Sequence, residues 1–283
     1  MIILGLALAA ALPALKSGAV VTLPPGRHDT IEISKQHFDP PVTIDAGNAE
    51  VAGVRIMDSS GIVWRGGIIT APGGRDARTP AGYAVNVRRS QNIGFDGGTM
   101  TGALRGMVFA NSRGLSVRNV NFTRLRSDGI DMAGVRDVRI ENNRFSEFAP
   151  IKATGSKTDG TWKDGDHPDA IQFWTTSVTP KNSDIVIRGN RIEGITQGIN
   201  FFGPVREGNS RVTIENNDLR VSYPPAITLY SCTDCRIRFN TARPFGASKH
   251  KANIRTENST AEMCGNIMPE TPDHPATTRC KLP

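Results

Sequence analysis

The sequence predicts an all-β protein built as a β-solenoid, and three observations support this prediction. The chain of 283 residues contains 29 glycines and, beyond its first 16 residues, is rich in Asn, Val and Ile rather than in helix-forming patterns. A short apolar segment recurs seven times, and a second alternating segment lies between successive copies. Units this short cannot bury a core alone, so they must stack on one another.

The first repeated segment is an eight-residue strand with apolar residues at positions one, three and eight. Its copies align without gaps, and their starts are 31, 22, 23, 47, 27 and 23 residues apart. A period of 22 or 23 residues with insertions is typical of stacked repeats. The seven copies begin at Ile62, Ile93, Leu115, Val138, Ile185, Val212 and Cys235.

The second segment has apolar residues at positions two and four and usually a polar residue at position three. This alternation indicates a strand with one buried face. Equivalent residues of adjacent coils should therefore form columns, spaced about 4.8 Å apart along the solenoid. The seven copies begin at Ala84, Gly106, Gly129, Ala170, Gly198, Ala226 and Asn253.

One polar column repeats a single residue type and is interpreted as structural. The sixth position of the first segment is Asn143, Asn190, Asn217 and Asn240, preceded in earlier copies by Gly67 and Gly98. An amide at a sharp turn that bonds to its stacked neighbours forms an Asn ladder. We therefore expect these residues to stabilise the fold and not to act on a ligand.

Two other columns change their chemistry from coil to coil, as a substrate-binding surface would. Long insertions flank the strands that carry them, and long loops on a rigid scaffold commonly carry function. The longest insertion begins at Phe148 and precedes "AIQF". The first column contains Asn86, Val108, Asp131, Gln172, Asn200, Thr228 and Arg255, and the second contains Arg105, Asp128, Asp169, Gln197 and Pro225.

The opening segment "AVVTLPPGRH" and the repeats, over roughly residues 18–260, resemble the pectate-lyase-like family of right-handed parallel β-helices. The resemblance implies a single-stranded right-handed parallel β-helix of about eight to ten coils. We place this domain at residues 15–262. The superfamily includes polysaccharide lyases, glycoside hydrolases, C5-epimerases and phage adhesins, so the fold alone does not give the function.

The motif "RSDGID", residues 126–131, resembles the "NTDGID" motif of polygalacturonase-type glycoside hydrolases. That family continues with a double aspartate, a "GHG" element and "RIK". The corresponding segments here are "HPDAIQ", "TQGIN" and "NIRTEN", so Pro168 replaces one aspartate and Gln197 replaces the histidine. Hydrolysis with Asp128 and Asp169 as acid and base therefore stands as an alternative to the leading prediction.

Asp128, Asp131 and Asp169 fall on adjacent coils of the two variable columns and are the central candidate catalytic residues. Carboxylates this close repel one another, so one pKa should rise unless a cation intervenes. The cluster can thus supply an acid and a base, or three oxygen ligands for a calcium ion. The alternative is that Asp128 and Asp169 only cap turns.

His167 is a candidate base because it precedes a proline that restricts the local backbone and neighbours Asp166 and Asp169 in sequence. A neutral histidine can take a proton beside a uronate carboxylate that a cation neutralises. The candidate cations are Lys163, Arg126 and Arg206. This chemistry is that of the lyases and C5-epimerases in the superfamily, so the leading prediction is a lyase that acts by β-elimination.

Further residues are expected to bind the substrate. Trp174 and Tyr230 should face outward and could stack on a sugar ring, with Trp162 and Phe202 nearby. Arg255 suits a carboxylate, or it pairs with Glu257. Gln172, Asn200 and Gln197 complete the polar columns. If these residues bind but do not react, the protein is a carbohydrate-binding adhesin or surface scaffold.

Charge and the two termini indicate where the protein works. Lys plus Arg exceed Asp plus Glu by 34 to 27, which suits an anionic polysaccharide, and no nucleic-acid-binding motif is present. Residues 1–14 resemble a signal peptide too short to span a bilayer, so we expect a secreted or periplasmic monomer. Cys264 and Cys280 could staple the C-terminal tail, residues 263–283, whereas Cys232 and Cys235 either pair or leave Cys235 in the core.

Overall fold

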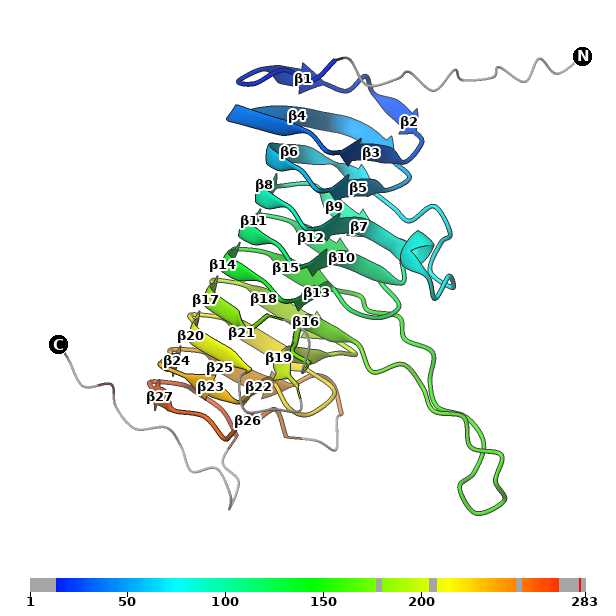
Figure 1. The fold of residues 1–283 in the computed structure, drawn as a ribbon. Helices are drawn as coiled ribbons and strands as arrows, with labels where there is room; N and C mark the ends of the chain where they lie inside the picture. The colour runs from blue at the N-terminus through cyan, green and yellow to red at the C-terminus, as the bar shows by residue number, and fades with distance from the viewer. Residues whose placement is uncertain (1–13, 177–179, 204–207, 248–250, 270–279, 281–283) are drawn as a thin grey trace, which may run out of the picture.

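The chain winds into a tall stack of coils in the computed structural model, which describes residues 14–176, 180–203, 208–247, 251–269 and 280 (Figure 1). The predicted signal peptide lies almost wholly outside the described residues. Within them, the only helical element is a single 3-10 turn, η1 (Pro80–Gly82), and no helix is long and apolar enough to cross a membrane.

Nine parallel strands form one sheet along the stack, and each corresponds to one coil. This number agrees with the predicted eight to ten coils. Because every coil contributes one strand here, the outer face of this sheet is a continuous surface along the solenoid. The strands are β3 (Ile31–Ser34), β5 (Val54–Met57), β7 (Tyr83–Arg88), β10 (Arg105–Ala110), β13 (Ile130–Ala133), β16 (Asp169–Trp174), β19 (Gln197–Phe202), β22 (Ile227–Tyr230) and β26 (Ile254–Glu257).

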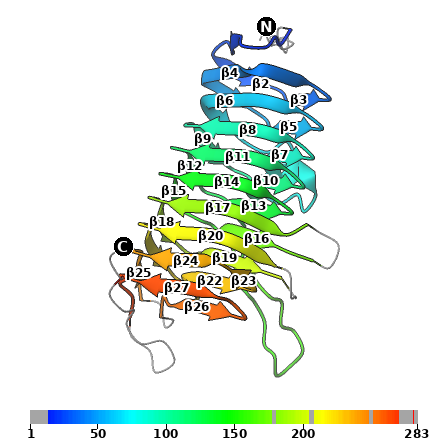
Figure 2. The ribbon, with the colours of Figure 1, turned by 60° about the vertical axis from the view of Figure 1, so that its left-hand side comes forward.

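The other eighteen strands form a second sheet that bends at the asparagine turns, so that most coils contribute two strands to it (Figure 2). Before or through the turn run β1 (Val20–Thr22), β4 (His37–Val51), β6 (Ser60–Ile69), β8 (Gln91–Asp96), β11 (Arg113–Arg118), β14 (Arg136–Glu141), β17 (Asn182–Arg188), β20 (Asn209–Glu215), β23 (Cys232–Thr233), β24 (Cys235–Arg238) and β27 (Ala261–Cys264). After it run β2 (Gly26–His28), β9 (Thr99–Thr101), β12 (Asn121–Thr123), β15 (Arg144–Ser146), β18 (Arg191–Gly194), β21 (Asp218–Val221) and β25 (Thr241–Pro244).

The strand register confirms the predicted repeat alignment. Leu115 of β11 pairs with Ile93 and Val138, which are the first residues of the neighbouring copies. In the nine-stranded sheet, Ile171 of β16 pairs in parallel with Ile130 and Ile199. The apolar positions of every repeat therefore stack inside the coil, and the prediction of an all-β parallel solenoid is confirmed.

Stacked aromatic rings fill the centre of the middle coils. The rings of Phe122 and Phe145 are stacked almost parallel with their centres 4.6 Å apart, and those of Phe173 and Phe201 are stacked 4.3 Å apart. All four side chains are fully buried. Because each ring contacts its equivalent in the next coil, the core is continuous along the solenoid and fixes the register of the outward residues.

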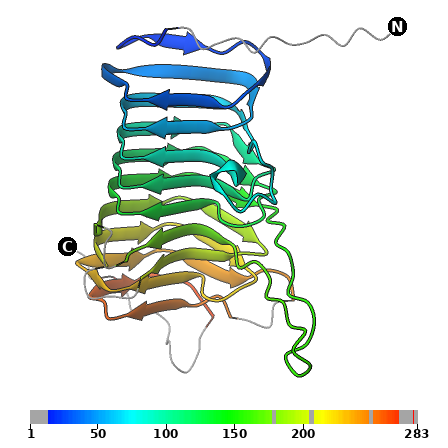
Figure 3. The same cartoon turned by 45° about the vertical axis from the view of Figure 1, so that its right-hand side comes forward.

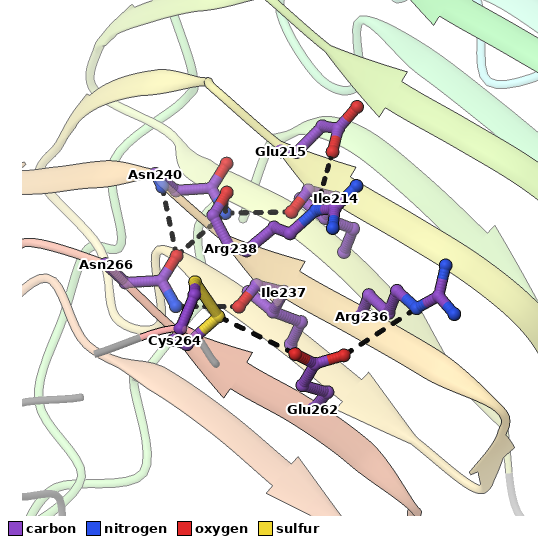
Figure 4. Close-up of a disulfide and its surroundings, with 10 residues drawn as sticks. Ile214, Glu215, Arg236, Ile237, Arg238, Asn240, Glu262, Cys264 and Asn266 are labelled. Carbon is purple, nitrogen blue, oxygen red and sulfur yellow. Dashed lines mark hydrogen bonds and ion pairs between the residues drawn. A yellow bond between two sulfur atoms is a disulfide. The ribbon is translucent and has the colours of Figure 1, made fainter. Parts of the chain in front are cut away.

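The Asn ladder forms as predicted and extends one coil further, to Asn266 (Figure 4). The side-chain amide of Asn217 donates to Asn240 Oδ1 at 2.9 Å, and the amide of Asn240 donates to Asn266 Oδ1 at 3.0 Å. In an earlier coil the corner is Gly98, with a φ of +86°. A Cβ there would lie 2.5 Å from the carbonyl oxygen of Gly66, so only glycine fits this corner.

Two disulfides are present, Cys232–Cys235 and Cys264–Cys280. The second disulfide attaches the C-terminal tail to β27, as expected, and its surroundings appear in Figure 4. The Cys232–Cys235 disulfide shows that these two residues pair, which the sequence left open.

The longest insertion, residues 148–168, forms an arm that extends away from the stacked coils (Figures 1 and 3). At its base the N–H of Asp166 donates to the carbonyl oxygen of Ile151 at 2.8 Å, and further out Thr154 and Lys163 form an antiparallel bridge. The arm therefore leaves the strand edge as a hairpin and does not lie flat over the nine-stranded sheet.

Candidate functional site

The candidate site lies on the outer face of the nine-stranded sheet, where β10, β13, β16 and β19 are adjacent. The predicted variable column is aligned residue by residue, because Asp131 pairs with Val108 on one side and with Gln172 on the other. Gln172 then pairs with Asn200 of β19. The core that fixes this register thus places acid, amide and cation side chains from successive coils beside one another.

Arg105, at the start of β10, connects two of the three candidate aspartates. Its Nε lies 2.9 Å from Asp128 Oδ2, and its Nη1 donates to Asp131 Oδ2 at 2.6 Å. The side chain of Arg105 is 31% exposed, whereas those of Asp128 and Asp131 are 3% and 11% exposed. The guanidinium therefore covers two nearly buried carboxylates and presents its remaining surface to solvent.

Asp169, the third aspartate, lies beneath a layer of amide side chains. Gln172 Nε2 donates to Asp169 Oδ2, Asn200 Nδ2 donates to Oδ1, and Trp174 Nε1 donates to Gln172 Oε1. Only 1% of Asp169 is exposed. Its hydrogen bond orients Gln172, and Gln172 in turn orients the ring of Trp174. Its place in this network makes it a positioning residue.

Asp128 does cap a turn, but the backbone that it caps belongs to the next coil and not to its own. Asp128 Oδ1 accepts the backbone N–H of Asp169 at 3.0 Å, so it caps the strand of the next coil. This close stacking requires Gly129, where a Cβ would lie 2.5 Å from the carbonyl oxygen of Ala170 and 2.7 Å from the Phe145 ring. The glycine of "RSDGID" thus allows the two aspartates to approach one another.

The pKa values of all three carboxyl groups are raised, mainly because burial disfavours the charged form. Burial raises the pKa of Asp131 to about 6, against the opposing attraction of Arg105. The pKa of Asp169 is raised well above its usual range by burial and by the neighbouring charge of Asp128. The pKa of Asp128 is raised by burial as well. The site therefore retains protons at a pH where exposed aspartates are ionised.

The calcium site suggested by Asp128, Asp131 and Asp169 does not fit this arrangement. The guanidinium of Arg105 occupies the position between Asp128 and Asp131 that a cation would take. Across the described part of the chain, no group of three or more His, Cys, Asp or Glu side chains is arranged to hold a metal ion. The aspartates are therefore compensated by an arginine and by protons.

An aromatic column continues along the same face. The rings of Trp174 and Phe202 lie 5.6 Å apart, those of Phe202 and Tyr230 lie 6.1 Å apart, and the guanidinium of Arg255 lies 5.6 Å from the Tyr230 ring. Trp174 is 43% exposed. Trp162, expected near this column, instead lies on the arm, where the Lys157 ammonium sits 5.1 Å from its ring.

A groove of about 540 Å³ hollows the same face at the other end, over β3, β5 and β7. Asn86 and Arg88 line it, and Asn86 pairs with Val108 in the variable column. The aspartate cluster thus lies between this groove and the aromatic column, so a polymer lying along the face would cross all three.

His167 lies at the strand edge, but with different partners from those expected. Its Nε2 is 3.4 Å from Asp164 Oδ1, and its side chain is 62% exposed. The neighbouring Asp166 is bonded to Arg126 instead. The ring of Tyr223, from the loop before β22, lies 6.3 Å from the His167 ring. His167 is therefore accessible, beside a tyrosine and not against the aspartate cluster.

Of the three predicted cations, the two that the structure describes are not brought to the cluster. Arg126 Nε donates to Asp166 Oδ2 at 2.7 Å and its Nη1 donates to Asp76 Oδ1 at 3.0 Å, which ties the base of the arm to the loop before η1. Lys163 lies on the arm, where its backbone pairs with Thr154. Arg206 lies outside the described residues.

Gln197 and Arg255, two further predicted binding residues, have their side chains bonded to other parts of the protein. Gln197 pairs in register with Asp169, but its side-chain amide donates to the carbonyl oxygen of Pro224 at 2.9 Å and so holds a loop. Arg255 lies 3.3 Å from Glu257 Oε2, which is the alternative that its sequence context allowed, and also over Tyr230. Both residues lie on the predicted face.

Arg105 and Tyr223 are the site residues that the sequence analysis did not select. Arg105 was visible in the column, one coil before Asp128, and a cation stacked directly before two acids was the signal. Tyr223 had no such signal, because it lies in an irregular loop whose path the repeat does not determine.

Solved structures that resemble this chain share its fold at low sequence identity. The surface protein and adhesin PfbA of Streptococcus pneumoniae has a TM-score of 0.60 and 14% identity, with 92% of this chain and 76% of that one covered. An alginate lyase from Paenibacillus sp. has a TM-score of 0.51 and 14% identity, with 84% and 95% covered. The ORF18 protein of Geobacillus virus E2 has a TM-score of 0.54 and 11% identity, with 88% and 54% covered.

These likenesses carry the fold alone, because one relative is an adhesin and another is a lyase. No curated protein is detectably similar in sequence. Residues 42–241 match the family described as the right handed beta helix region. The match covers most of the chain and includes Asp128, Asp131 and Asp169. Together with the parallel register of the coils, this match shows that the chain belongs to the right-handed β-helix family.

Proposed function

We propose that this protein is a secreted or periplasmic enzyme that cleaves an acidic, uronate-containing polysaccharide by β-elimination. The observation that carries the proposal is the pairing of Arg105 with Asp131 on the outer face of the nine-stranded sheet. A guanidinium binds carboxylates, and beside it lies a carboxyl group whose pKa is raised to about 6. This is the combination that proton abstraction next to a uronate carboxyl group requires.

In the elimination, a base removes the proton from C5 of the uronate, the carbon that bears the carboxyl group. The electron pair forms a double bond between C4 and C5, and the bond from C4 to the glycosidic oxygen breaks. The leaving oxygen takes up a proton and becomes a hydroxyl group. Arg105 would bind the uronate carboxylate and stabilise the negative charge that develops on it.

Asp131 is the group best suited to be the base. A base works most efficiently when its pKa lies near the working pH, and the pKa of Asp131 is raised to about 6. Burial raises the pKa of Asp169 well above its usual range, and its two oxygens accept hydrogen bonds from Gln172 and Asn200, so this group is less suited to take a proton from a substrate. His167, the base predicted from the sequence, is accessible at the strand edge and is the second candidate for this role.

The surroundings suit a sugar polymer. Trp174, Phe202 and Tyr230 offer ring faces in successive coils, on which sugar rings can stack. The groove over β3, β5 and β7 lies on the other side of the aspartates and provides room for further sugar units. The excess of 34 Lys plus Arg over 27 Asp plus Glu favours the approach of an anionic polymer.

One observation favours a second candidate, a protein that binds carbohydrate without cleaving it. Only 2% of Asp128 and 1% of Asp169 are exposed, so neither carboxyl group can contact a substrate in this arrangement. The same burial opposes the hydrolase alternative, which needs both groups at the glycosidic bond. A binding protein would use Arg105 and the aromatic column in the same way, but without proton transfer at Asp131.

The test is to incubate the protein with a panel of polyuronates and to measure two products in parallel. The proposal expects the ultraviolet absorbance of an unsaturated uronate together with new reducing ends. It also expects Asp131→Asn to lose this activity, while Asp184→Asn, the same substitution at an exposed site on β17, retains it. Reducing ends without absorbance would indicate the hydrolase, and binding with neither signal would indicate the adhesin.

A further inference from the structure

A second and larger groove runs along a different part of the solenoid. Its volume is about 900 Å³, and it follows the corner where the coils pass from the nine-stranded sheet into the first strands of the eighteen-stranded sheet. One column of register-paired residues follows it through six successive coils, a length of about 24 Å at the usual spacing of parallel strands. The column consists of His37, Ser60, Gln91, Arg113, Arg136 and Ser183.

A second row of residues lines the groove from the turns. Four consecutive coils place a residue there in the left-handed region, with φ values from 47° to 63°, so the turns repeat the same shape. The buried hydroxyls of Ser90 and Ser112 form the floor, because each accepts the backbone N–H of the preceding coil, at 3.2 and 3.1 Å. The groove is therefore a preformed channel. The turn residues are Asp58, Arg89, Asn111 and Gly134.

Positive charge in this groove is not fully compensated. Arg113 donates two hydrogen bonds to Gln91 Oε1, at 2.8 and 2.5 Å, and this acceptor is a neutral amide. Arg136 interacts electrostatically with Asp184, but that carboxylate is already bonded to Arg211 Nε at 2.6 Å. Among the described lining residues Asp58 is the only carboxylate, and it is bonded to Arg89 at 2.7 and 2.8 Å.

The stacking of Arg113 directly on Arg136 is unfavourable unless an anion is bound. The two residues are register partners in adjacent coils, and like charges placed opposite one another destabilise a sheet. Other stacked arginines of this sheet have a carboxylate within reach. Arg191, which stacks on Arg144, lies 3.4 Å from Glu193 Oε2. Arg220, which stacks on Arg243, lies 3.5 Å from Glu193 Oε1. A site that accepts this repulsion has the charge pattern of an anion-binding surface.

We infer that this groove binds a stretch of a linear acidic polysaccharide that runs parallel to the solenoid axis. The spacing of adjacent coils, about 4.8 Å, is of the same order as the length of one sugar unit, so carboxylates along the chain can meet cations along the coils. Arginines bind carboxylates, and Gln91, Asn111 and Ser183 can bond to hydroxyl groups. No Phe, Tyr or Trp side chain is among the described lining residues, whereas single-stranded nucleic acid is bound largely by stacking on aromatic rings.

The groove goes beyond the proposed function, because it holds the polymer away from Asp131 and does not depend on elimination. Arg89 lines both this groove and the groove over β3, β5 and β7, so the two meet at one corner. One polymer chain can therefore pass from the sheet face around the corner. Such an anchor would keep a long substrate attached while another part of it reaches the aspartate cluster.

The test compares two double variants in the binding of a long polyuronate at low salt. Arg113→Gln with Arg136→Gln removes two charges from the groove and should weaken binding by about tenfold, because two exposed ion pairs with the polymer are lost. Arg144→Gln with Arg191→Gln is the matched control, because these residues are also exposed register partners on the eighteen-stranded sheet but lie past the asparagine turn. The control should bind like the wild type, and salt of about 0.5 M should abolish the difference.

Equal binding by the two double variants would overturn the inference. Tighter binding of single-stranded DNA than of polyuronate would also overturn it, because a polyanion site of another kind would then be present. The measurement is made in an Asp131→Asn background, so that cleavage does not interfere. Failure of the proposed elimination would appear only in the product assay and would leave this comparison unchanged.

Discussion

The wild-type protein should become less stable as the pH rises, because the buried carboxyl group of Asp131 must lose its proton, and Asp131→Asn should remove this effect. Burial raises the pKa of Asp131 to about 6, whereas an exposed aspartate has a pKa near 3.9. The folded state therefore binds this proton more tightly than the unfolded state. The stabilisation is fully present below about pH 4 and is lost as the pH rises through about 6.

The size of the effect follows from the difference of about two pH units between the two states. Each unit corresponds to about 1.4 kcal/mol, so the free energy of unfolding should fall by about 3 kcal/mol between about pH 4 and pH 7 because of this group. Solvent screening reduces the value little, since the Asp131 side chain is only 11% exposed. Asn has the same shape but no proton to lose in this range, so its variant lacks this contribution.

The assay is equilibrium unfolding in urea between about pH 5 and pH 8, a window that contains about half of this fall, about 1.4 kcal/mol, with the slope of stability against pH as the readout. Asp184→Asn is the control, because hydrogen bonds from Arg211 lower the pKa of Asp184 to about 2. A lowered pKa stabilises above the unfolded value and is lost only as the pH falls through about 2, outside the window. This control should therefore follow the slope of the wild type.

The wild type should lose stability more steeply than Asp131→Asn as the pH rises. Parallel curves for the wild type, Asp131→Asn and Asp184→Asn would refute the reasoning, because they would mean that Asp131 titrates as an exposed carboxyl group. A lower but parallel curve for Asp131→Asn would have the same meaning. Such a result would show only the loss of its bond to Arg105.

Three further predictions concern the ladder, the aromatic column and the arm. Asn217→Ala leaves partners of the buried amide unsatisfied above and below, so it should cost about 3 to 5 kcal/mol in thermal or urea unfolding, and a loss below about 1 kcal/mol would contradict the ladder's role. Trp174→Ala should weaken oligosaccharide binding about fivefold in titration calorimetry, whereas Trp162→Ala on the arm should leave it unchanged. Arg126→Gln removes the bonds to Asp166, so hydrogen exchange at the base of the arm should become faster; unchanged protection would show that the backbone alone holds it.

The parts of the fold that repeat could be predicted from the sequence, because stacking enforces the same environment in every coil. Apolar residues such as Ile171 and Leu115 recur at fixed positions, and one alignment therefore gave the register of both sheets. The asparagine at the corner was predictable for the same reason, since its amide bonds to the equivalent amide of the next coil and to nearby backbone groups. The alignment ended with the copy that begins at Cys235, although the segment that begins at Ala261 pairs with it in register and supplies Asn266 to the ladder.

The site was predictable in position but not in its contacts. The columns placed Asp131, Gln172 and Asn200 on one face, as found. They could not show that Arg105 bridges Asp128 and Asp131, because a column gives neighbours in the sheet and not the direction in which a long side chain extends. Nor could they show how deeply the aspartates lie, since burial there depends on the amides that cover them.

Residues in the insertions were the least predictable. The arm carries Lys163 and Trp162 away from the sheet, and its base turns Arg126 and Asp166 toward each other. Nothing in a repeat alignment determines the direction of such a hairpin, because no equivalent coil constrains it. The cations proposed from these segments therefore had to be replaced by Arg105, which belongs to a strand.

The rate of formation of unsaturated product from a polyuronate, measured as a function of pH, tests the central claim most directly. If Asp131 is the base, the rate should rise as its carboxyl group loses a proton and should level off above about pH 6. The rise should be absent in Asp131→Asn and unchanged in Asp184→Asn. A wild-type rate that does not change across this range would contradict the role of Asp131, and no unsaturated product at any pH would contradict elimination itself.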